Sequence, residues 1–477
     1  MILNSIEQKI IFYIRKCNLI LTFFIYTILI FTIYNLVNND LDDVFGVEKE
    51  SPMVHDQNLQ ISQFTTEQLN FPTGLDFLDE DDILVIEKNT GQVKRILDGE
   101  ILNEPVLDVN VDSSSERGLL GIAILNTKIL TTSDITTNEQ PQQENNLDNE
   151  VKVFLFYTET ADVDNGNILG NRLYKYDFID GKLVNPNLLL DLPFLPGPAH
   201  NGGVLELGPD KNLYLVVGDL YLVVENINHP NYQKYVTLAQ NVEDSKLPDG
   251  RGGVLRLTVD GDPLLDNDFS SLERNYGLLN FYYGYGIRNS FGIGFDPLTG
   301  ILWETENGPD YGDEINVILP GFNGGWTQVL GLSTEYENFT NKEFDRSKII
   351  GTYYDPVFTW VTTVAPTAIT FIDSKIFGEE YENDLLVGSA KQGGRIFHFN
   401  LNETRTGLDL PPGELVDKMA DVDEELEAVT LGRNFGVITD IEINPYDGII
   451  YVVDGQTYNG KIYQIHPKEL KQVEKTN

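Results

Sequence analysis

Cysteine, methionine, tryptophan and histidine are all scarce in this chain of 477 residues. The single cysteine, Cys17, excludes an intramolecular disulfide. Only 3 methionines stand against 23 tyrosines and 25 phenylalanines, a balance more typical of packed strands than of helical bundles. Stability must therefore come from the packing of a β-rich core or from bound metal.

Basic residues are also few. The chain has 33 lysines and arginines against 74 acidic residues, which gives a formal net charge of −41. A nucleic-acid partner is excluded, because a phosphate backbone needs a basic footprint on the protein. The same charge favours solubility and cation binding. An anionic ligand would need a local basic pocket.

One long apolar run lies near the N-terminus. Residues 19–37 carry no charge, with Lys9, Arg15 and Lys16 before them and acidic residues after them. Their length fits a bilayer, and the basic flank is expected to stay in the cytoplasm. We expect residues 1–18 to be cytoplasmic, 19–37 to be a transmembrane signal anchor and 38–64 to be a linker. The alternative is a cleaved signal peptide, and in both cases the rest of the chain is extracytoplasmic.

A strand pattern repeats along the remainder of the chain. An alternating apolar strand, a turn with Pro, Asp or Gly and a second strand rich in Leu, Val and Tyr recur, for example over 203–219, 292–306 and 441–454. Five clear units and a degenerate sixth predict an all-β fold, a six-bladed β-propeller over residues 65–467. An array of β-sandwiches is the alternative. Residues 126–150 are expected to form a surface insertion, and 468–477 a tail.

Two loops carry residues suited to chemistry. His200 lies in Pro-Gly-Pro-Ala-His-Asn-Gly-Gly, where glycines allow a ligand close to the backbone and the imidazole could act as a general base. A structural hydrogen bond is its alternative role. Arg288 and Asn289 directly precede a strand and could hold an anionic or carbonyl oxygen. A role in bracing the loop is equally open.

A third loop, residues 306–316, is rich in carboxylates and bent by Gly308, Pro309 and Gly312. Such oxygen ligands suit a hard cation, and calcium tolerates irregular geometry. A solvated acidic turn is the alternative interpretation. Lys391 follows a buried strand in Ser-Ala-Lys-Gln-Gly-Gly, and it is either a ligand-binding cation or an exposed surface residue.

Taken together, these motifs resemble the soluble, pyrroloquinoline-quinone-dependent glucose/sorbosone dehydrogenase family, of the aldose sugar dehydrogenase type. The similar stretches are 116–123, 200–210, 286–297, 307–316 and 321–326, and the resemblance extends over residues 65–467. It implies a six-bladed propeller, in agreement with the count of repeats.

The resemblance also implies roles for individual residues. His200 would be the base for the C1 hydroxyl of the sugar, and Glu116 and Asn201 would lie near the substrate. The expected ligands of the quinone are Arg288, which would also offset charge on the reduced quinone, with Asn289 and Lys391. The expected ligands of Ca²⁺ are the carbonyls of Gly308 and Pro309 and the side chain of Asp313.

Two positions depart from the family pattern. The family often has an Arg-x-Arg pair before the last repeat, whereas this chain has Val-Ile-Thr-Asp over 437–440. Arg433 is the nearest candidate to replace it as a cofactor ligand. Position 324 is Gly where Tyr is usual.

The function implied is an extracytoplasmic quinoprotein dehydrogenase, held in the cell membrane by a single span. It would oxidise a sugar or polyol at C1 by hydride transfer to Ca²⁺-activated pyrroloquinoline quinone and pass electrons to a redox carrier. One alternative is a non-catalytic cell-surface propeller that binds a glycan or protein. Another is a calcium-dependent hydrolase or lactonase, with acidic metal ligands around the central axis.

Overall fold

The computed structural model describes residues 51–65, 67–126, 150–162, 166–220, 248–267, 269, 277–326, 329–335 and 351–469. The chain divides into two compact units, Met1–Ser51 and Pro52–Asn477, and every described strand belongs to the second. The expected membrane anchor over 19–37 and most of the expected insertion over 126–150 lie outside the described residues. In the part that is described, no helix is long and apolar enough to cross a membrane.

Strands dominate the described residues and form six sheets. The first three sheets, each given from its innermost strand outward, contain the following strands: β3 (Pro72–Asp79), β4 (Asp82–Glu87), β5 (Gln92–Leu97) and β6 (Glu100–Ile101), with β7 (Leu107–Asp108) also on β5; β8 (Leu119–Asn126), β9 (Val151–Thr160), β10 (Ile168–Ile179) and β11 (Lys182–Leu192); β12 (Leu205–Leu207), β13 (Leu213–Val217), β14 (Gly253–Leu257), β15 (Tyr282–Tyr285), β19 (Phe322–Asn323) and β20 (Thr352–Tyr353).

The other three sheets follow the same plan. Their strands are β16 (Ser290–Phe295), β17 (Leu302–Glu306), β18 (Asp313–Ile318), β21 (Phe358–Trp360) and β25 (Met419–Ala420); β22 (Pro366–Phe371), β23 (Leu385–Ser389), β24 (Ile396–Phe399), β26 (Thr430–Arg433) and β1 (Met53–Val54); β27 (Ile438–Ile443), β28 (Ile450–Asp454), β29 (Lys461–Pro467) and β2 (Leu59–Gln63). The described helices are short: η2 (Gly277–Phe281), η3 (Ser333–Glu335), η4 (Glu414–Asp417) and α4 (Asp423–Ala428).

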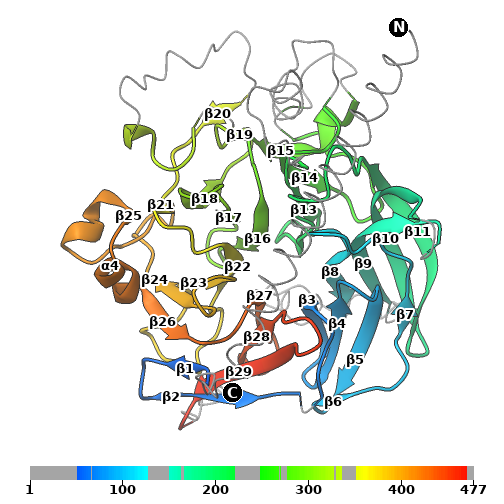
Figure 1. Cartoon of the computed structure of the whole chain (residues 1–477), viewed down its shortest axis with the longest axis horizontal. Helices are drawn as coiled ribbons and strands as arrows, with labels where there is room; N and C mark the ends of the chain where they lie inside the picture. The colour runs from blue at the N-terminus through cyan, green and yellow to red at the C-terminus, as the bar shows by residue number, and fades with distance from the viewer. Residues whose placement is uncertain are drawn as a thin grey trace, which may run out of the picture. The chain divides into compact units, whose positions relative to one another are not determined.

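The six sheets close into a ring. Their innermost strands β3, β8, β12, β16, β22 and β27 contact one another in that order, and β27 contacts β3 (Figure 1). The prediction of an all-β propeller is therefore confirmed, and a linear array of sandwiches does not describe this fold.

The ring is closed by strands from both ends of the described chain. Strand β2 pairs antiparallel with β29, from Leu59 opposite Pro467 to Gln63 opposite Tyr463. The linker expected over 38–64 is corrected here, because residues 53–54 and 59–63 form strands β1 and β2. Their partners are about 400 residues away in sequence, so no local pattern reveals the pairing.

The core lies between neighbouring sheets. In β4, every residue from Ile83 to Glu87 is buried, because both faces of the sheet are covered. Phe77 of β3 packs edge-on against Tyr451 of β28, with ring centroids 5.2 Å apart. Each such side chain contributes about 1.5–3 kcal/mol when it leaves water. The propeller is thus stabilised by side chains packed between neighbouring sheets. The loops at the ends of the inner strands are not needed for this core and are available to form a functional site.

Candidate functional site

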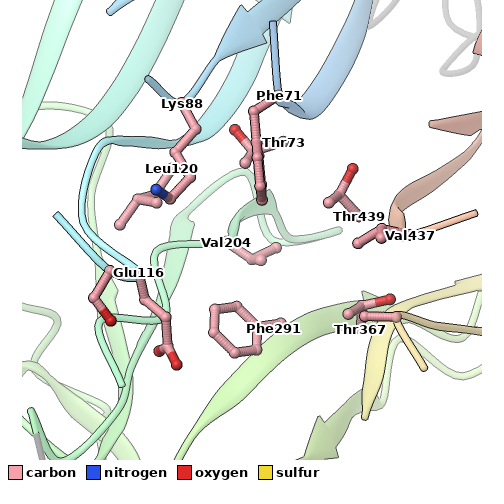
Figure 2. A pocket seen from close by; sticks show the side chains of 13 residues that line it. Phe71, Thr73, Lys88, Glu116, Leu120, Val204, Phe291, Thr367, Val437 and Thr439 are labelled. Atoms are coloured by element: carbon pink, nitrogen blue, oxygen red, sulfur yellow. The ribbon is translucent and has the colours of Figure 1, made fainter. Parts of the chain in front are cut away.

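A cavity of about 220 Å³ opens where the inner strands converge. Five of these strands each contribute a wall residue, and Val204 directly precedes the sixth, β12. The five wall residues are Thr73 of β3, Leu120 of β8, Phe291 of β16, Thr367 of β22 and Thr439 of β27. The cavity therefore lies on the axis of the ring, where loops from every sheet can reach a common ligand (Figure 2).

The cavity continues inward along the axis as a smaller space of about 30 Å³. Its wall includes the carboxyl groups of Glu206, Asp440 and Glu442. Burial raises the pKa of Asp440 to about 7 and raises the pKa of Glu206 and of Glu442 well above their usual range. Burial therefore favours the neutral, protonated form of these three carboxyl groups at the inner end.

His200 is not itself a wall residue of this cavity, but it lies in the turn next to the wall. Its backbone has a positive φ of 60°, in the turn that leads to wall residues Gly202 and Val204. Nδ1 of the imidazole lies 2.7 Å from Oδ1 of Asp219, and both side chains are buried. The other Asp219 oxygen, Oδ2, accepts a 2.8 Å hydrogen bond from Nε1 of Trp326.

These two contacts assign the imidazole tautomer. An ionised carboxylate only accepts hydrogen bonds, so Nδ1 of His200 carries the hydrogen and donates it to Asp219. Nε2 then bears the lone pair and is the nitrogen that can take up a proton. Asp219 is also placed so that it would stabilise an imidazolium at His200, as the buried carboxylate of a catalytic triad does.

Arg288 lies in the same cluster. Its guanidinium carbon is 5.5 Å from the ring centroid of Trp326, and its carbonyl oxygen accepts a 2.8 Å hydrogen bond from the Asp219 backbone N–H. Nη1 donates to the carbonyl oxygen of Asn307 at 2.5 Å. Asp219 and Trp326 thus join His200 to Arg288, which places a base and a fixed cation in one site.

Asn289, next to Arg288, is 5% exposed, and its Oδ1 has no hydrogen-bond partner among the described residues. Oε2 of Glu306 likewise has no hydrogen-bond partner among the described residues. Its other oxygen, Oε1, accepts a 2.7 Å hydrogen bond from the Arg288 backbone N–H. A buried polar atom without a partner is costly unless a ligand or water satisfies it. These atoms indicate a place for a group that the protein does not itself supply.

The loop from Gly308 to Gly312 is held tightly. A Cβ on Gly308 would lie 1.9 Å from the Tyr311 carbonyl oxygen, so this position requires glycine. Among the described residues, no N–H or O–H donates to the carbonyl oxygen of Gly308 or Pro309. No group of three His, Cys, Asp or Glu side chains in the described ranges is placed to hold a metal ion. Any metal here would therefore depend on carbonyl oxygens.

Asp313, the third expected metal ligand, is occupied by hydrogen bonds. Its Oδ1 accepts from the Gly308 N–H at 2.9 Å. Its Oδ2 accepts from the Thr363 hydroxyl at 2.7 Å and from the N–H groups of Val364 and Ala365 at 2.7 and 2.9 Å. Burial raises the pKa of Asp313 against the opposing effect of these four bonds. The arrangement favours a carboxylate that braces the loop.

The two expected substrate residues differ in position. Glu116 is a wall residue of the cavity, and its Oε2 accepts from the His200 backbone N–H at 2.5 Å. Asn201 is fully buried, with Nδ2 on the Pro198 carbonyl oxygen at 2.8 Å and Oδ1 bonded by Asn171 at 3.2 Å. Glu116 therefore faces the cavity, and Asn201 holds the shape of the His200 loop.

The expected cofactor cations Lys391 and Arg433 lie farther from the cavity wall. Lys391 is exposed, although its neighbour Ala390 lines the cavity. Arg433 ends β26, opposite Met53 of β1, and is not a wall residue. Val437 and Thr439, from the segment without arginine, do line the cavity. The departure from the family pattern therefore falls on the cavity wall itself.

Sequence reasoning missed three residues of this site: Lys88, Asp219 and Trp326. Lys88, Asp219 and Asn307 each come just after the second strand of a sheet, which is β4, β13 or β17. Asn307 lies in a loop that the sequence already marked as functional. The equivalent position in the other two repeats was therefore the signal that could have found Lys88 and Asp219. Trp326 comes from a different loop, and only the folded chain brings it to Asp219.

Comparison with known proteins assigns the family. The glucose/sorbosone dehydrogenase family model matches residues 69–464. Quinoprotein glucose dehydrogenase B of Acinetobacter calcoaceticus is 28% identical over 286 residues, which cover 57% of this chain and 54% of that protein. The aldose sugar dehydrogenase YliI of Escherichia coli (strain K12) is 25% identical over 337 residues, 70% of this chain and 78% of that one.

Solved structures agree at the level of the fold. The aldose sugar dehydrogenase of Streptomyces coelicolor, in its form bound to pyrroloquinoline quinone (PQQ), superposes with a TM-score of 0.57 and 22% identity. The match covers 87% of this chain and 99% of that protein. With the family model spanning nearly the whole propeller, this chain belongs to the glucose/sorbosone dehydrogenase family, and it is an oxidoreductase of the sugar dehydrogenase type.

Proposed function

We propose that this protein oxidises the C1 hydroxyl of a sugar, with PQQ as its cofactor. The observation that carries the proposal is the His200 imidazole, fixed by Asp219 and joined through Trp326 to Arg288 beside a cavity on the ring axis. The names of the two relatives and the PQQ-bound neighbour support the choice of cofactor.

The cavity suits a planar, oxygen-rich group. Apolar side chains such as Phe71, Leu120 and Phe291 line it, which favours a flat ring system. Outside the wall residues, in the cluster around His200, the buried Oδ1 of Asn289 has no partner among the described residues, and Arg288 supplies a fixed guanidinium. When bound, PQQ supplies the two-electron acceptor for the hydride from C1.

The residues of the chain handle the proton and the substrate. Nε2 of His200 takes the proton of the C1 hydroxyl as general base, and Asp219 stabilises the imidazolium. Arg288 stabilises negative charge that develops beside it. Glu116 lines the cavity and positions the His200 backbone. Loss of a hydride and a proton converts an aldose to its lactone.

Calcium belongs to the same proposal. The carbonyl oxygens of Gly308 and Pro309 would be its protein ligands, and Asp313 would act by holding the loop that presents them. Bound calcium would supply Lewis-acid polarisation of a cofactor carbonyl. A redox carrier would then accept the electrons.

We also infer that each of the six sheets is one blade, because their inner strands follow one another round the ring. For the N-terminus we propose a single membrane span over 19–37, with the propeller outside the cytoplasm. Protease treatment of intact cells should cut the propeller while sparing residues 1–18. Protection of the whole chain would contradict this orientation.

The function is tested by dye reduction. The full chain, loaded with PQQ and Ca²⁺, should reduce a dye when a panel of aldoses is added. His200→Ala should lose turnover and keep the fold. Full activity in this variant would overturn the assignment of His200 as the base. No activity in the wild-type chain would overturn the proposal that the protein oxidises a sugar with PQQ.

A non-catalytic propeller that binds a glycan is the second candidate. The neutral wall residues Val437 and Thr439 favour it, because the described residues on that side of the cavity wall include no cation. Glycan binding without any change in the quinone spectrum would support it over the first.

A further inference from the structure

Lys88 is a buried cation in the cavity wall. It follows β4, is 6% exposed, and lies in the wall with Glu116 (Figure 2). Its ammonium donates to two neutral acceptors, Oδ1 of Asn89 and the carbonyl oxygen of Ser113, both at 3.2 Å. No carboxylate of the described residues lies within ion-pair distance of Nζ, whereas most of the buried arginines are paired.

The chain around Lys88 fixes its position. The Lys88 N–H donates to the Phe71 carbonyl oxygen, and the Leu119 N–H donates to the Lys88 carbonyl oxygen. A Cβ on Gly118 would lie 2.6 Å from Cγ of Lys88, so the glycine lets this loop pack directly on the side chain. The ammonium also lies 5.1 Å from the ring centroid of Phe71. This cation is held in place before any ligand arrives.

An unpaired buried cation has a cost in this environment. Burial lowers the pKa of Lys88 to about 8, although the negative charges of Glu116 and Asp112 act in the opposite direction. A group that is fixed, desolvated and unpaired would gain most from an anion brought by a ligand. Among the described residues, Lys88 is the one buried lysine.

The other described wall residues of the cavity supply no second cation for an anionic ligand group. In Figure 2, Lys88 and Glu116 lie on one side, and Val437, Thr439 and Thr367 lie on the other. Those three residues carry no charge, and Lys88 is the one basic residue among the described residues of the wall. Glu116 beside it is already engaged through Oε2, which accepts from the His200 backbone N–H. An anionic group of a ligand in this cavity therefore has Lys88 as its cationic partner on the wall.

We propose that Lys88 binds a carboxylate of the ligand that occupies the axial cavity. The ligand class rests on the proposed function: the carboxylate belongs either to the quinone cofactor, which is a tricarboxylic acid, or to a sugar acid. The interaction is one charge-assisted hydrogen bond from a preformed donor.

Binding of PQQ to the full chain, followed by its absorbance and by the unfolding temperature, tests the first source. Lys88→Met should raise the Kd for PQQ about 10- to 100-fold, and Lys88→Arg by less than about threefold. The trimethyl ester of PQQ should bind both variants and the wild-type chain alike, which also shows that the cavity is intact. Lys375→Met, which changes a lysine with 75% side-chain exposure, is the matched control and should change nothing.

D-glucuronate and D-glucose, compared by the same stabilisation measurement, test the second source. Glucuronate binding that falls tenfold in Lys88→Met, with unchanged PQQ binding, assigns the sugar acid as the ligand. If the wild-type chain binds glucuronate through Lys88 but never binds PQQ, the proposed function fails and the Lys88 site stands. Equal binding of PQQ and of glucuronate by wild type and Lys88→Met overturns the Lys88 site, as does the absence of any carboxylate binding to the wild-type chain.

Discussion

At the scale of single residues, the site depends on how side chains hold one another. His200 was identifiable from its glycine-rich loop, but its partner Asp219 was not, because the two meet only when β12 and β13 pair. Lys88 was missed for a similar reason. Its importance comes from being buried without an ion-pair partner, a property that no local pattern reports.

Asp219→Asn tests the assignment of the imidazole tautomer. The amide keeps an oxygen for the Trp326 N–H but no longer stabilises an imidazolium at His200. We expect kcat to fall by about 10²- to 10⁴-fold with little change in KM. Steady-state dye reduction measures both constants.

Trp326→Phe is the matched control for that experiment, because it removes one hydrogen bond to Asp219 and keeps a ring beside Arg288. A smaller loss, of about tenfold, is expected. If Asp219→Asn retained wild-type kcat, Asp219 would have no role in the proton transfer.

The lowered pKa of Lys88 leads us to expect that the stability of the fold depends on pH. That pKa in the folded chain, about 8, is below its ordinary value of 10.5, so between these values the unfolded chain binds more protons. Stability contributed by this group therefore rises with pH across that window. Lys88→Met should be more stable than wild type at pH 7, by about 2 kcal/mol after allowance for screening.

That difference should shrink as the pH rises through 8 towards 10.5. Urea unfolding at several pH values gives the measurement, with Lys375→Met as the reference variant. A constant difference between Lys88→Met and wild type at all pH values would show that Lys88 does not titrate in this window.

At the scale of elements, the hairpins could be predicted and the short outer strands could not. The turn Pro-Tyr-Asp-Gly between alternating strands identified β27 and β28. Two-residue strands such as β19, β20 and β25 are set by parallel partners far along the chain. The loop expected over 306–316 is shorter in the structure, because β17 ends at Glu306 and β18 begins at Asp313. The role of Asp313 in bracing this loop appears only in its four hydrogen bonds.

Asp313→Ala tests that bracing role. Loss of the carboxylate leaves three backbone N–H groups and the Thr363 hydroxyl without their acceptor, so we expect unfolding to become easier by about 2–4 kcal/mol. The stabilisation by calcium, read from the shift in unfolding temperature, should weaken as the loop loosens. Asp310→Ala, at an exposed carboxylate of the same loop, is the control.

Unchanged stability together with weakened calcium binding in Asp313→Ala would point the other way. Asp313 would then be a direct ligand, as the family resemblance implies, rather than a brace.

At the scale of the whole molecule, the ring makes one site from loops far apart in sequence. The repeat pattern predicted an all-β propeller because every sheet uses the same hairpin. The ring closure, through the pairing of β2 with β29, could not be predicted, because the segment before residue 65 has no repeat of its own. The net charge of −41 follows directly from the composition. The position of Lys88 in the cavity wall of so acidic a chain appears only in the folded structure.

Ser62→Pro tests the ring closure. Ser62 lies opposite Gln464 in the closing pair of strands, two residues before Phe64, whose N–H donates to the Ile462 carbonyl oxygen. The Ser62 N–H therefore also faces β29, and proline removes a ladder hydrogen bond there. We expect a loss of about 3 kcal/mol in unfolding free energy, against about 1 kcal/mol for Ser62→Ala, which keeps the backbone donor. Equal effects of the two substitutions would show that the β2 pairing contributes little to the fold.

The central claim is that His200, Asp219 and Arg288 form the oxidation site beside the axial cavity. Single-turnover reduction of bound PQQ, followed by absorbance after addition of an aldose, tests it most directly. The account predicts rapid reduction in the wild-type chain and reduction at least about 100-fold slower in His200→Gln, with equal PQQ affinity in both. Reduction at the same rate in both proteins, or no reduction in the wild-type chain, would contradict it.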